Sequence, residues 1–298
     1  MEGTSLKHQD LGRITGSTRA IAILGYPVHH SLSPVIHNAA FAAAGLDYCY
    51  LALEVRPEDI ETAVRGLRAA NFAGITLTAP HKETVIPLLD ELTEEARAMG
   101  AVNTVVNRDG RWIGTNTDAT GFRRLLELNG LYRKGMKAVM LGAGGAARAA
   151  LYVLGQVCGE IVIFNRTRQR AEGLVRSLSA FRGDARWTVL PLETGLVSAH
   201  LEGADVLVNT TSVGMHPNGQ ECPLPDGVRI PPTCGVADMI YMPPKTRLLQ
   251  LAEAAGAKAV SGHDMLLYQA VDAFKFWTGV DPDIAVMDAA LRRAREGG

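Results

Sequence analysis

Apolar and polar positions alternate along the first part of the chain in a pattern typical of α/β proteins. Short apolar runs bounded by turn residues indicate buried strands, whereas apolar residues three or four positions apart indicate helices. The pattern predicts a βαβαβ unit, then two short helices and a hairpin with an Asp-Gly turn. These elements are predicted at Ala20–Leu24, Pro34–Ala44, Tyr48–Val55, Pro57–Ala70, Gly74–Thr78, Glu83–Leu89, Thr93–Ala98, Ala101–Val106 and Arg111–Gly114.

A second alternating series follows a predicted helix, Asp118–Leu128, and a basic linker, Tyr132–Lys137. Strands and helices again succeed one another, which predicts a second, parallel sheet, and no internal repeat relates the two halves. The elements are predicted at Lys137–Gly142, Ala146–Gly155, Glu160–Phe164, Arg168–Leu178, Arg186–Leu190, Asp205–Asn209, Val236–Ile240, Lys245–Ala255, Ala257–Val260, Met265–Thr278 and Asp283–Arg295.

Length and charge narrow the class of protein. At about 100–200 residues per domain, 298 residues predict two domains. With 47% hydrophobic residues, 20% charged residues and a formal net charge of -1, the chain is predicted to be globular, without a nucleic-acid or membrane partner. The longest apolar stretch, 138–158, is interrupted by glycines, Arg148 and Gln156, so no transmembrane helix is predicted.

The N-terminus, the cysteines and the histidines suggest no special chemistry. Residues 1–19 lack an apolar h-region and are predicted to form a loose tail rather than a signal peptide, which favours the cytoplasm. His30 and His37 could share a helix face, but a chance pair is preferred over a metal site, and no metal is predicted. Without C-x-x-C spacing, reduced and buried thiols are predicted at Cys49, Cys158, Cys222 and Cys234.

A glycine-rich loop follows the first strand of the second series and opens a helix. This strand-turn-helix setting makes G-x-G-x-x-[GA] a useful indication of a dinucleotide site, with the anion at the helix N-terminus. Gly142 would make the tight turn, Gly144 would admit the pyrophosphate, and Ala147 would keep helix and strand close. The alternative is a turn that binds nothing. The loop consists of Gly142, Ala143, Gly144, Gly145, Ala146 and Ala147.

The end of the next strand favours NADP over NAD. An NAD site normally places Asp or Glu there for the ribose 2′-hydroxyl. Here Asn165, Arg166 and Thr167 follow the strand, with Arg170 beyond, and they offer donors suited to a 2′-phosphate. The alternative is that the arginines are a solvated helix start.

Two groups could transfer a proton, and two hydroxyls could bind an anion. Lys82 lies at the carboxyl end of a predicted parallel strand, and Asp118 begins a helix near the domain junction. Each has a plain alternative, as a surface residue at a helix start or as an N-cap. Ser31 and Ser33 lie at the mouth of the first helix, where a substrate carboxylate could bind. Ser33 is predicted to be the N-cap of that helix, with Pro34 in the first helical position and Gly45 after its end. The alternative to anion binding is that Ser33 does no more than cap the helix.

Eight motifs, in order over residues 20–280, make the chain resemble the shikimate dehydrogenase family. Any one of them is weak evidence, but an accidental match of the whole series is improbable. The motifs are G-Y-P-V-H-H-S-L-S-P at 25–34, T-A-P-H-K at 78–82, G-A-V-N-T at 100–104, G-T-N-T-D at 114–118, G-A-G-G-A-A-R at 142–148, N-R-T at 165–167, N-T-T-S-V-G-M at 209–215 and M-L-L-Y-Q-A at 265–270.

The resemblance implies reversible NADPH-dependent reduction of 3-dehydroshikimate to shikimate, in the pathway to chorismate and aromatic amino acids. Lys82 and Asp118 match the family's catalytic pair. Carboxylate and hydroxyl contacts are implied for Ser31, Ser33, Thr78, Asn103, Tyr241 and Gln269. Contacts with NADP are implied for Gly142, Ala143, Gly144, Gly145, Ala146, Asn165, Arg166, Thr167, Arg170, Thr210, Gly262 and Met265.

With the resemblance, we expect an α/β substrate domain at 20–118 plus 263–298 and a Rossmann-type, doubly wound NADP domain at 119–262. The cleft between them would hold a small-molecule substrate, in a monomer or a homodimer. Thr76 departs from the family's usual N-V-T, and His263 with Asp264 stands where small or apolar residues are common. Two alternatives stay open: a quinate/shikimate dehydrogenase acting on quinate, and a non-catalytic NADP-binding sensor.

Overall fold

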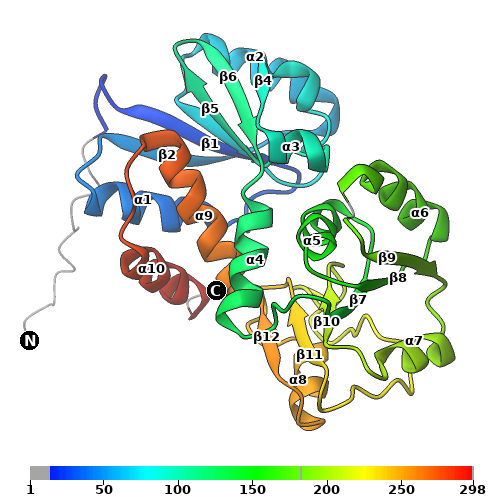
Figure 1. Cartoon of the computed structure of the whole chain (residues 1–298). Coiled ribbons are helices and arrows are strands. Elements are labelled where there is room, and N and C mark those ends of the chain that lie inside the picture. The colour runs from blue at the N-terminus through cyan, green and yellow to red at the C-terminus, as the bar shows by residue number, and fades with distance from the viewer. Residues whose placement is uncertain (1–13, 182, 297–298) are drawn as a thin grey trace, which may run out of the picture.

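The chain folds around two six-stranded sheets, as seen in a computed structural model that describes residues 14–181 and 183–296. Figure 1 shows them as two separate halves, each covered by helices, with α4 (Asp118–Leu128) and α9 (His263–Thr278) running between them. This arrangement confirms the predicted α/β class with a Rossmann-type second half.

The first sheet has the order β2-β1-β3-β5-β6-β4. Its first three strands are parallel, as the βαβαβ pattern predicts, and β5 turns the sheet antiparallel through its pairing with β3. Asp109 and Gly110 both have positive φ in the turn of the β5–β6 hairpin, which explains the Asp-Gly signal. The strands are β1 (Arg19–Gly25), β2 (Tyr48–Glu54), β3 (Gly74–Leu77), β4 (Glu91–Leu92), β5 (Thr104–Arg108) and β6 (Arg111–Thr115).

Two predictions in the first half are wrong. The N-cap of α1 is Leu32, whose helical dihedrals leave Ser33 inside the helix without a capping bond. The helix predicted at 83–89 is only a 3₁₀ turn, because Pro87 lacks the backbone N–H that an α-helix would need there. Gly45 does follow the end of α1, with φ of 65°. The helices are α1 (Ser33–Ala43), η1 (Pro57–Asp59), α2 (Ile60–Ala69), η2 (Ile86–Leu88) and α3 (Glu94–Met99).

The second sheet is parallel throughout and has the order β12-β11-β10-β7-β8-β9. Chain order therefore reverses between β7 and β10, which is the switch point where doubly wound sheets bind ligands. Helix α7 escaped prediction because it is short, contains Gly195 and buries only Val197 and Leu201. The elements are β7 (Lys137–Leu141), α5 (Gly145–Gly155), β8 (Glu160–Phe164), α6 (Arg168–Ser177), η3 (Ser179–Phe181), β9 (Arg186–Leu190), α7 (Thr194–Leu201), β10 (Val206–Asn209), β11 (Gly235–Asp238), α8 (Arg247–Ala254) and β12 (Ala259–Ser261).

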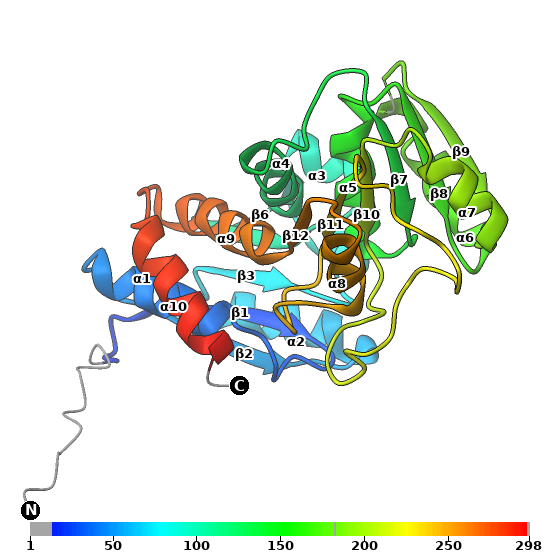
Figure 2. The ribbon, with the colours of Figure 1, turned by 90° about the horizontal axis from the view of Figure 1, so that it is seen from below.

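Helix α9 returns the chain to the first half and joins the two cores. Its first turn places Met265 in the core of the second sheet, while Phe274 and Trp277 pack against the first sheet. The Trp277 indole Nε1–H donates to the carbonyl of Val105 at 2.9 Å, which holds the helix on β5. Figure 2 shows α9 and α10 (Ile284–Glu296) beside α1, with α4 next to α9.

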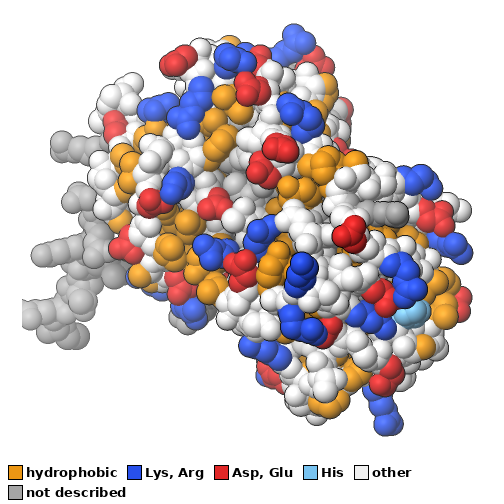
Figure 3. All heavy atoms as spheres, in the orientation of Figure 1, with side chains coloured by type: hydrophobic (Ala, Val, Ile, Leu, Met, Phe, Trp, Pro, Cys, Tyr) orange, Lys and Arg blue, Asp and Glu red, His pale blue; other side chains and the backbone are white. Residues whose placement is uncertain are grey.

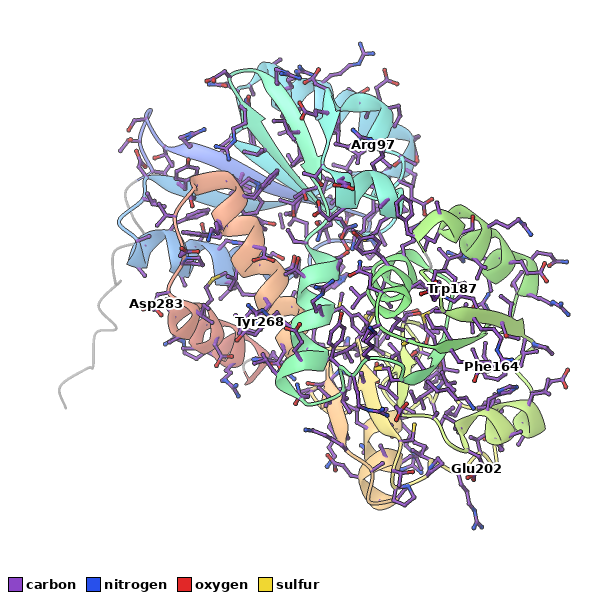
Figure 4. All side chains as sticks on the ribbon, in the orientation of Figure 1. Arg97, Phe164, Trp187, Glu202, Tyr268 and Asp283 are labelled. Carbon is purple, nitrogen blue, oxygen red and sulfur yellow. The ribbon has the colours of Figure 1, made fainter. Side chains whose placement is uncertain are left out.

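Both faces of the second sheet carry a core. Phe164 and Trp187 come from neighbouring strands, β8 and β9 (Figure 4), and they pack into cores on different faces of the sheet. Acidic and basic side chains are interspersed over the face seen in Figure 3, in keeping with the formal net charge of -1. No described helix is long and apolar enough to cross a membrane.

The cysteines and the N-terminus partly depart from expectation. All four thiols are free, and burial raises the pKa of Cys158 and Cys234 to about 12. Cys49 and Cys222 are only half-buried, so the prediction of burial is wrong for these two. Of the predicted tail, residues 1–13 lie outside the described residues, whereas the hydroxyls of Ser17 and Thr18 donate to the Asp47 carboxylate at 2.8 and 2.6 Å.

Candidate active site

A polar pocket lies where loops of the first sheet meet the second sheet, with a volume of about 180 Å³. The carboxyl ends of β1 and β3, the start of α4 and the first turns of α9 contribute to its wall. The structure gathers here both predicted catalytic residues and all six predicted substrate-binding residues: Ser31, Ser33, Thr78, Lys82, Asn103, Asp118, Tyr241 and Gln269.

Lys82 and Asp118 form an ion pair in this pocket. The Lys82 Nζ donates to the Asp118 Oδ2 at 2.6 Å, and the side chains are 20% and 9% exposed. Lys82 follows β3, where its carbonyl accepts from the N–H of Val102 at 2.8 Å. Thr117 is the N-cap of α4, so Asp118 is neither a cap nor a surface acid. The structure thus contradicts the N-cap alternative for Asp118, and Lys82 lies in a turn rather than at a helix start.

Two asparagines hold Asp118, one through its carboxylate and one through its backbone N–H. The Asn103 Nδ2 donates to its Oδ1 at 2.8 Å and to the Thr117 hydroxyl at 3.0 Å. The Asn103 Oδ1 accepts from the N–H of Thr117 at 2.8 Å, and the Asn116 Oδ1 accepts from the N–H of Asp118 at 3.0 Å. One carboxylate oxygen is therefore held by the protein, and the other faces the lysine.

The pocket also contains a tyrosine hydroxyl that the sequence reasoning missed. Tyr50 is buried, and its hydroxyl is hydrogen-bonded to that of Thr76. Burial raises the pKa of Tyr50, while the nearby hydroxyls of Thr76 and Ser33 act in the opposite direction. Alternation along β2 could have placed Tyr50 on the same face as Tyr48, but only the pairing of β2, β1 and β3 brings it to Thr76.

His37 lines the same pocket and contacts Tyr50. Its ring stacks on Tyr50 with centroids 4.6 Å apart and meets Trp277 edge-on at 5.0 Å. Burial lowers the pKa of His37 to about 3, so the ring is neutral. His30 lies in the loop before α1 rather than on the helix face shared with His37. Among the described residues, no group of three or more His, Cys, Asp or Glu side chains could hold a metal.

A second, larger pocket of about 580 Å³ lies at the carboxyl ends of β7, β8 and β10. Gly142 has φ of 107°, and a Cβ there would lie 2.6 Å from the Thr210 hydroxyl, so only glycine fits this turn. At Gly144, the N-cap of α5, an added Cβ would meet no protein atom within 4 Å. The loop therefore leaves open space in front of a helix N-terminus, which fits a dinucleotide's phosphates.

Most of the predicted cofactor residues line this larger pocket. They are Gly142, Ala143, Gly144, Gly145, Asn165, Arg166, Arg170 and Thr210. Ala146 and Thr167 do not line it, and the Thr167 carbonyl instead accepts from the Asn165 Nδ2 at 2.8 Å. Arg166 and Arg170 are exposed beside the pocket, whereas Arg168 pairs with Glu172 at 2.8 Å.

The two pockets adjoin at the loop that follows β3. Thr78 lines the polar pocket and the next residue, Ala79, lines the larger one. Gly262 and Met265, which the sequence reasoning gave to the cofactor, lie in the wall of the polar pocket. A ligand in the larger pocket can therefore reach a second ligand beside the Lys82–Asp118 pair.

The doubly wound sheet, the glycine loop and the adjoining acid–base pair define an oxidoreductase of the dinucleotide-dependent class. Residues 23–105 match the shikimate dehydrogenase substrate binding domain, and residues 262–292 match the shikimate 5′-dehydrogenase C-terminal domain. A shikimate dehydrogenase (NADP⁺) of Moorella thermoacetica is 46% identical over 284 residues, which cover 95% of each chain. The chain belongs to the shikimate dehydrogenase family.

Solved structures agree with this family. A shikimate dehydrogenase in complex with NADP⁺ has a TM-score of 0.87 and 38% identity, covering 95% of this chain and 98% of its own. The Thermus thermophilus enzyme in complex with NADP(H) and shikimate has a TM-score of 0.82 and 38% identity, covering 93% and 100%. A quinate dehydrogenase of Corynebacterium glutamicum in complex with NAD has a TM-score of 0.84 and 30% identity, covering 93% and 99%.

Proposed function

We propose that this protein catalyses the reversible NADPH-dependent reduction of 3-dehydroshikimate to shikimate. The observation that carries the proposal is the Lys82–Asp118 ion pair, 2.6 Å long, in a polar pocket that adjoins the glycine-loop pocket. In this proposal residues 20–118 and 263–298 form the substrate domain, and residues 119–262 form the cofactor domain.

The polar pocket offers a carboxylate seat and several hydroxyl contacts. Ser31 and Ser33 supply hydroxyls near the start of α1, and Tyr241 adds a half-buried phenol hydroxyl to the lining. Together they would bind the substrate carboxylate. The ring hydroxyls would contact Thr78 and Gln269, while Asn103 would act mainly through the carboxylate it orients.

The larger pocket fits NADP. The glycine loop would hold the pyrophosphate, and Arg166 with Arg170 would hold the 2′-phosphate. When bound, the cofactor supplies or accepts the hydride. Gly262 and Met265, in the wall of the polar pocket, would border its nicotinamide.

Lys82 and Asp118 would stabilise the charge that develops on the substrate and transfer the proton. As the ring ketone becomes an alcohol, negative charge grows on its oxygen, and the Lys82 ammonium is placed to stabilise that charge through an N–H of Nζ. Asp118 would orient the lysine through Oδ2. The pair would supply the proton in reduction and accept it in oxidation.

Quinate is the second candidate substrate, because a quinate dehydrogenase shares the fold at 30% identity. The arginines beside the larger pocket favour NADP, while that relative is named in complex with NAD. A non-catalytic sensor would have no use for an oriented lysine–carboxylate pair, and this chain keeps one.

One matrix of assays tests the proposal. The purified protein is assayed with shikimate and with quinate, each with NADP⁺ and with NAD⁺. Shikimate with NADP⁺ is expected to give the highest kcat/KM. Equal or faster turnover of quinate would favour the second candidate, and no turnover of either, with NADP⁺ still bound, would favour the sensor.

A further inference from the structure

Asp238, the last residue of β11, is a fully buried carboxylate between the two pockets but lines neither. Its Oδ1 accepts from the Asn209 Nδ2 at 2.9 Å and from the N–H of Ile240 at 3.1 Å. Its Oδ2 accepts from the Thr246 hydroxyl at 2.6 Å. Burial raises the pKa of this carboxyl group, and the three hydrogen bonds oppose that rise.

The first branch of this network reaches the larger pocket. Asn209 ends the neighbouring strand β10, and its Oδ1 accepts from both the N–H and the hydroxyl of Thr211, at 3.0 and 2.8 Å. The Thr211 hydroxyl in turn accepts from the N–H of Val213 at 3.2 Å. Thr211 and Val213 both line the glycine-loop pocket, so this branch shapes the loop that faces the cofactor.

The second branch reaches the polar pocket. The N–H of Ile240 points to Asp238, and its carbonyl accepts from the N–H of Gly262 at 3.0 Å. Gly262 packs so closely that an added Cβ would lie 2.2 Å from the carbonyl oxygen of Met239. Met239, Tyr241 and Gly262 all line the polar pocket, so the same carboxylate oxygen holds the backbone of this wall.

The third branch serves the fold rather than a pocket. Thr246 is the N-cap of α8, where its hydroxyl oxygen accepts from the N–H of Leu249 at 3.3 Å. Neither residue lines either pocket. The two oxygens of Asp238 therefore have different roles. Oδ1 accepts the hydrogen bonds that lead to the two pockets, and Oδ2 accepts the hydrogen bond from the cap of α8.

We propose that Asp238 is a positioning residue that sets the cofactor loop and the substrate wall together. The inference rests on the proposed function for the identity of the two ligands. Both loops are irregular backbone after the ends of parallel strands, so one shared acceptor fixes their relative placement. Loss of that acceptor is expected to weaken the binding of both ligands, whereas loss of the Thr246 contact should leave their binding unchanged.

Substitutions separate these duties. Asp238→Asn can keep its oxygen toward Asn209 and Ile240 and turn its NH₂ toward Thr246, which has a free lone pair. Asp238→Ala leaves both donors without an acceptor. Thr246→Val is the matched control, since it removes only the bond at Oδ2 and the helix cap. Asn209→Ala breaks the cofactor branch alone.

Each variant is tested by the Kd of NADP⁺, from direct binding, and by the KM of shikimate. Asp238→Ala is expected to raise both by about tenfold, as for a lost hydrogen bond, while Asp238→Asn changes them by less than about threefold. Thr246→Val should lower the Tm and change both constants by less than about twofold. Asn209→Ala should raise the Kd about tenfold and leave the KM within about twofold.

The proposal is overturned if folded Asp238→Ala keeps both constants within about twofold of the parent, or if Asp238→Asn is as impaired as Asp238→Ala. If Asp238→Ala does not fold, the test is the Kd of NADP⁺ for the Asn209→Ala variant. An unchanged Kd in that variant overturns the proposal. Because the Kd needs no turnover, a parent inactive on shikimate would contradict the proposed function and leave the comparison of Kd values standing.

Discussion

Lys82 donates one of its three N–H bonds to Asp118, and its side chain remains 20% exposed to the pocket. If it stabilises developing charge, it binds the transition state more tightly than the ground state, so Lys82→Ala should lower kcat by about 10²–10⁴ with little change in KM. Steady-state kinetics on shikimate measure this. Lys258→Ala, an exposed lysine outside both pockets, is the control. A folded Lys82→Ala protein with nearly unchanged kcat and a raised KM would remove the catalytic assignment.

Arg166 lines the larger pocket, and Arg168, two residues later, pairs with Glu172 instead. A guanidinium that holds the 2′-phosphate contributes about 1.5–3 kcal/mol through charge-assisted bonds. Arg166→Ala should therefore weaken the binding of NADP⁺ by that amount and the binding of NAD⁺ far less. Arg168→Ala should change the affinity for neither cofactor. Titration of each cofactor gives the two Kd values. Equal weakening of NADP⁺ and NAD⁺ by Arg166→Ala would show that the arginine does not read the phosphate.

His37 makes stability depend on pH. Its pKa is about 3 in the folded protein and 6.5 when unperturbed, so below pH 6.5 the unfolded chain binds the extra proton. The stability that the protein gains from a neutral His37 is complete above pH 6.5 and is lost progressively as the pH falls toward 3. Between pH 7 and pH 5 the parent should lose about 2 kcal/mol more free energy of unfolding than His37→Phe. Urea denaturation at both pH values checks this, and parallel losses in the two proteins would contradict it.

At the scale of elements, one indole holds α9 on the first sheet. Trp277→Phe removes the indole donor to the Val105 carbonyl, which should cost about 0.5–1.5 kcal/mol beyond the loss of ring area. Trp112 is equally buried, but its Nε1 has no hydrogen-bond partner, so Trp112→Phe measures the ring area alone. The difference in free energy of unfolding isolates the bond. Equal costs in the two variants would mean that the bond contributes nothing.

Elements with simple periodicity were predictable from sequence. The strands Glu160–Phe164 and Arg186–Leu190 have the predicted bounds, because their apolar runs are short and end at turn residues. Elements decided by single backbone groups were not. Pro87 converts an apolar helical pattern into a 3₁₀ turn, and the helical dihedrals of Leu32 move the cap of α1. Strand β4 has only two residues and no pattern of its own.

The residues of the candidate site also differ in how far the sequence predicts them. The glycine loop was predictable because it follows strand β7 directly, whereas Lys82 was suggested by its place in the loop after β3 and by the family resemblance. Tyr50 and His37 were not assigned to the pocket, because only the pairing of strands and the return of α9 bring them to it. Asp238 likewise looks like any strand end until Asn209 and Thr246 are seen to converge on it.

At the scale of the whole molecule, Arg148 connects the two halves beside the active site. From α5 its guanidinium donates to Glu83 at 2.8 Å and to the Met99 carbonyl at 3.2 Å, and Glu83 directly follows Lys82. Arg148→Gln and Glu83→Gln should each lower kcat/KM by a few-fold, about 1 kcal/mol or less for a partly exposed pair. Because they remove one contact, the double variant should be no worse than the more damaging single variant. Additive losses would mean that the two residues act separately.

Within residues 14–181 and 183–296, the chain passes between the halves twice, through α4 on the way out and from β12 into α9 on the way back, and α4 and α9 pack against each other (Figure 1). Both covalent connections therefore lie together on one side of the active site. On the other side, α3 meets α5 through contacts such as those of Arg148. The two halves are therefore joined covalently along one side only, and on the opposite side the described residues hold them together through side-chain contacts. Widening the gap enough to exchange a dinucleotide needs no strand to separate from its sheet.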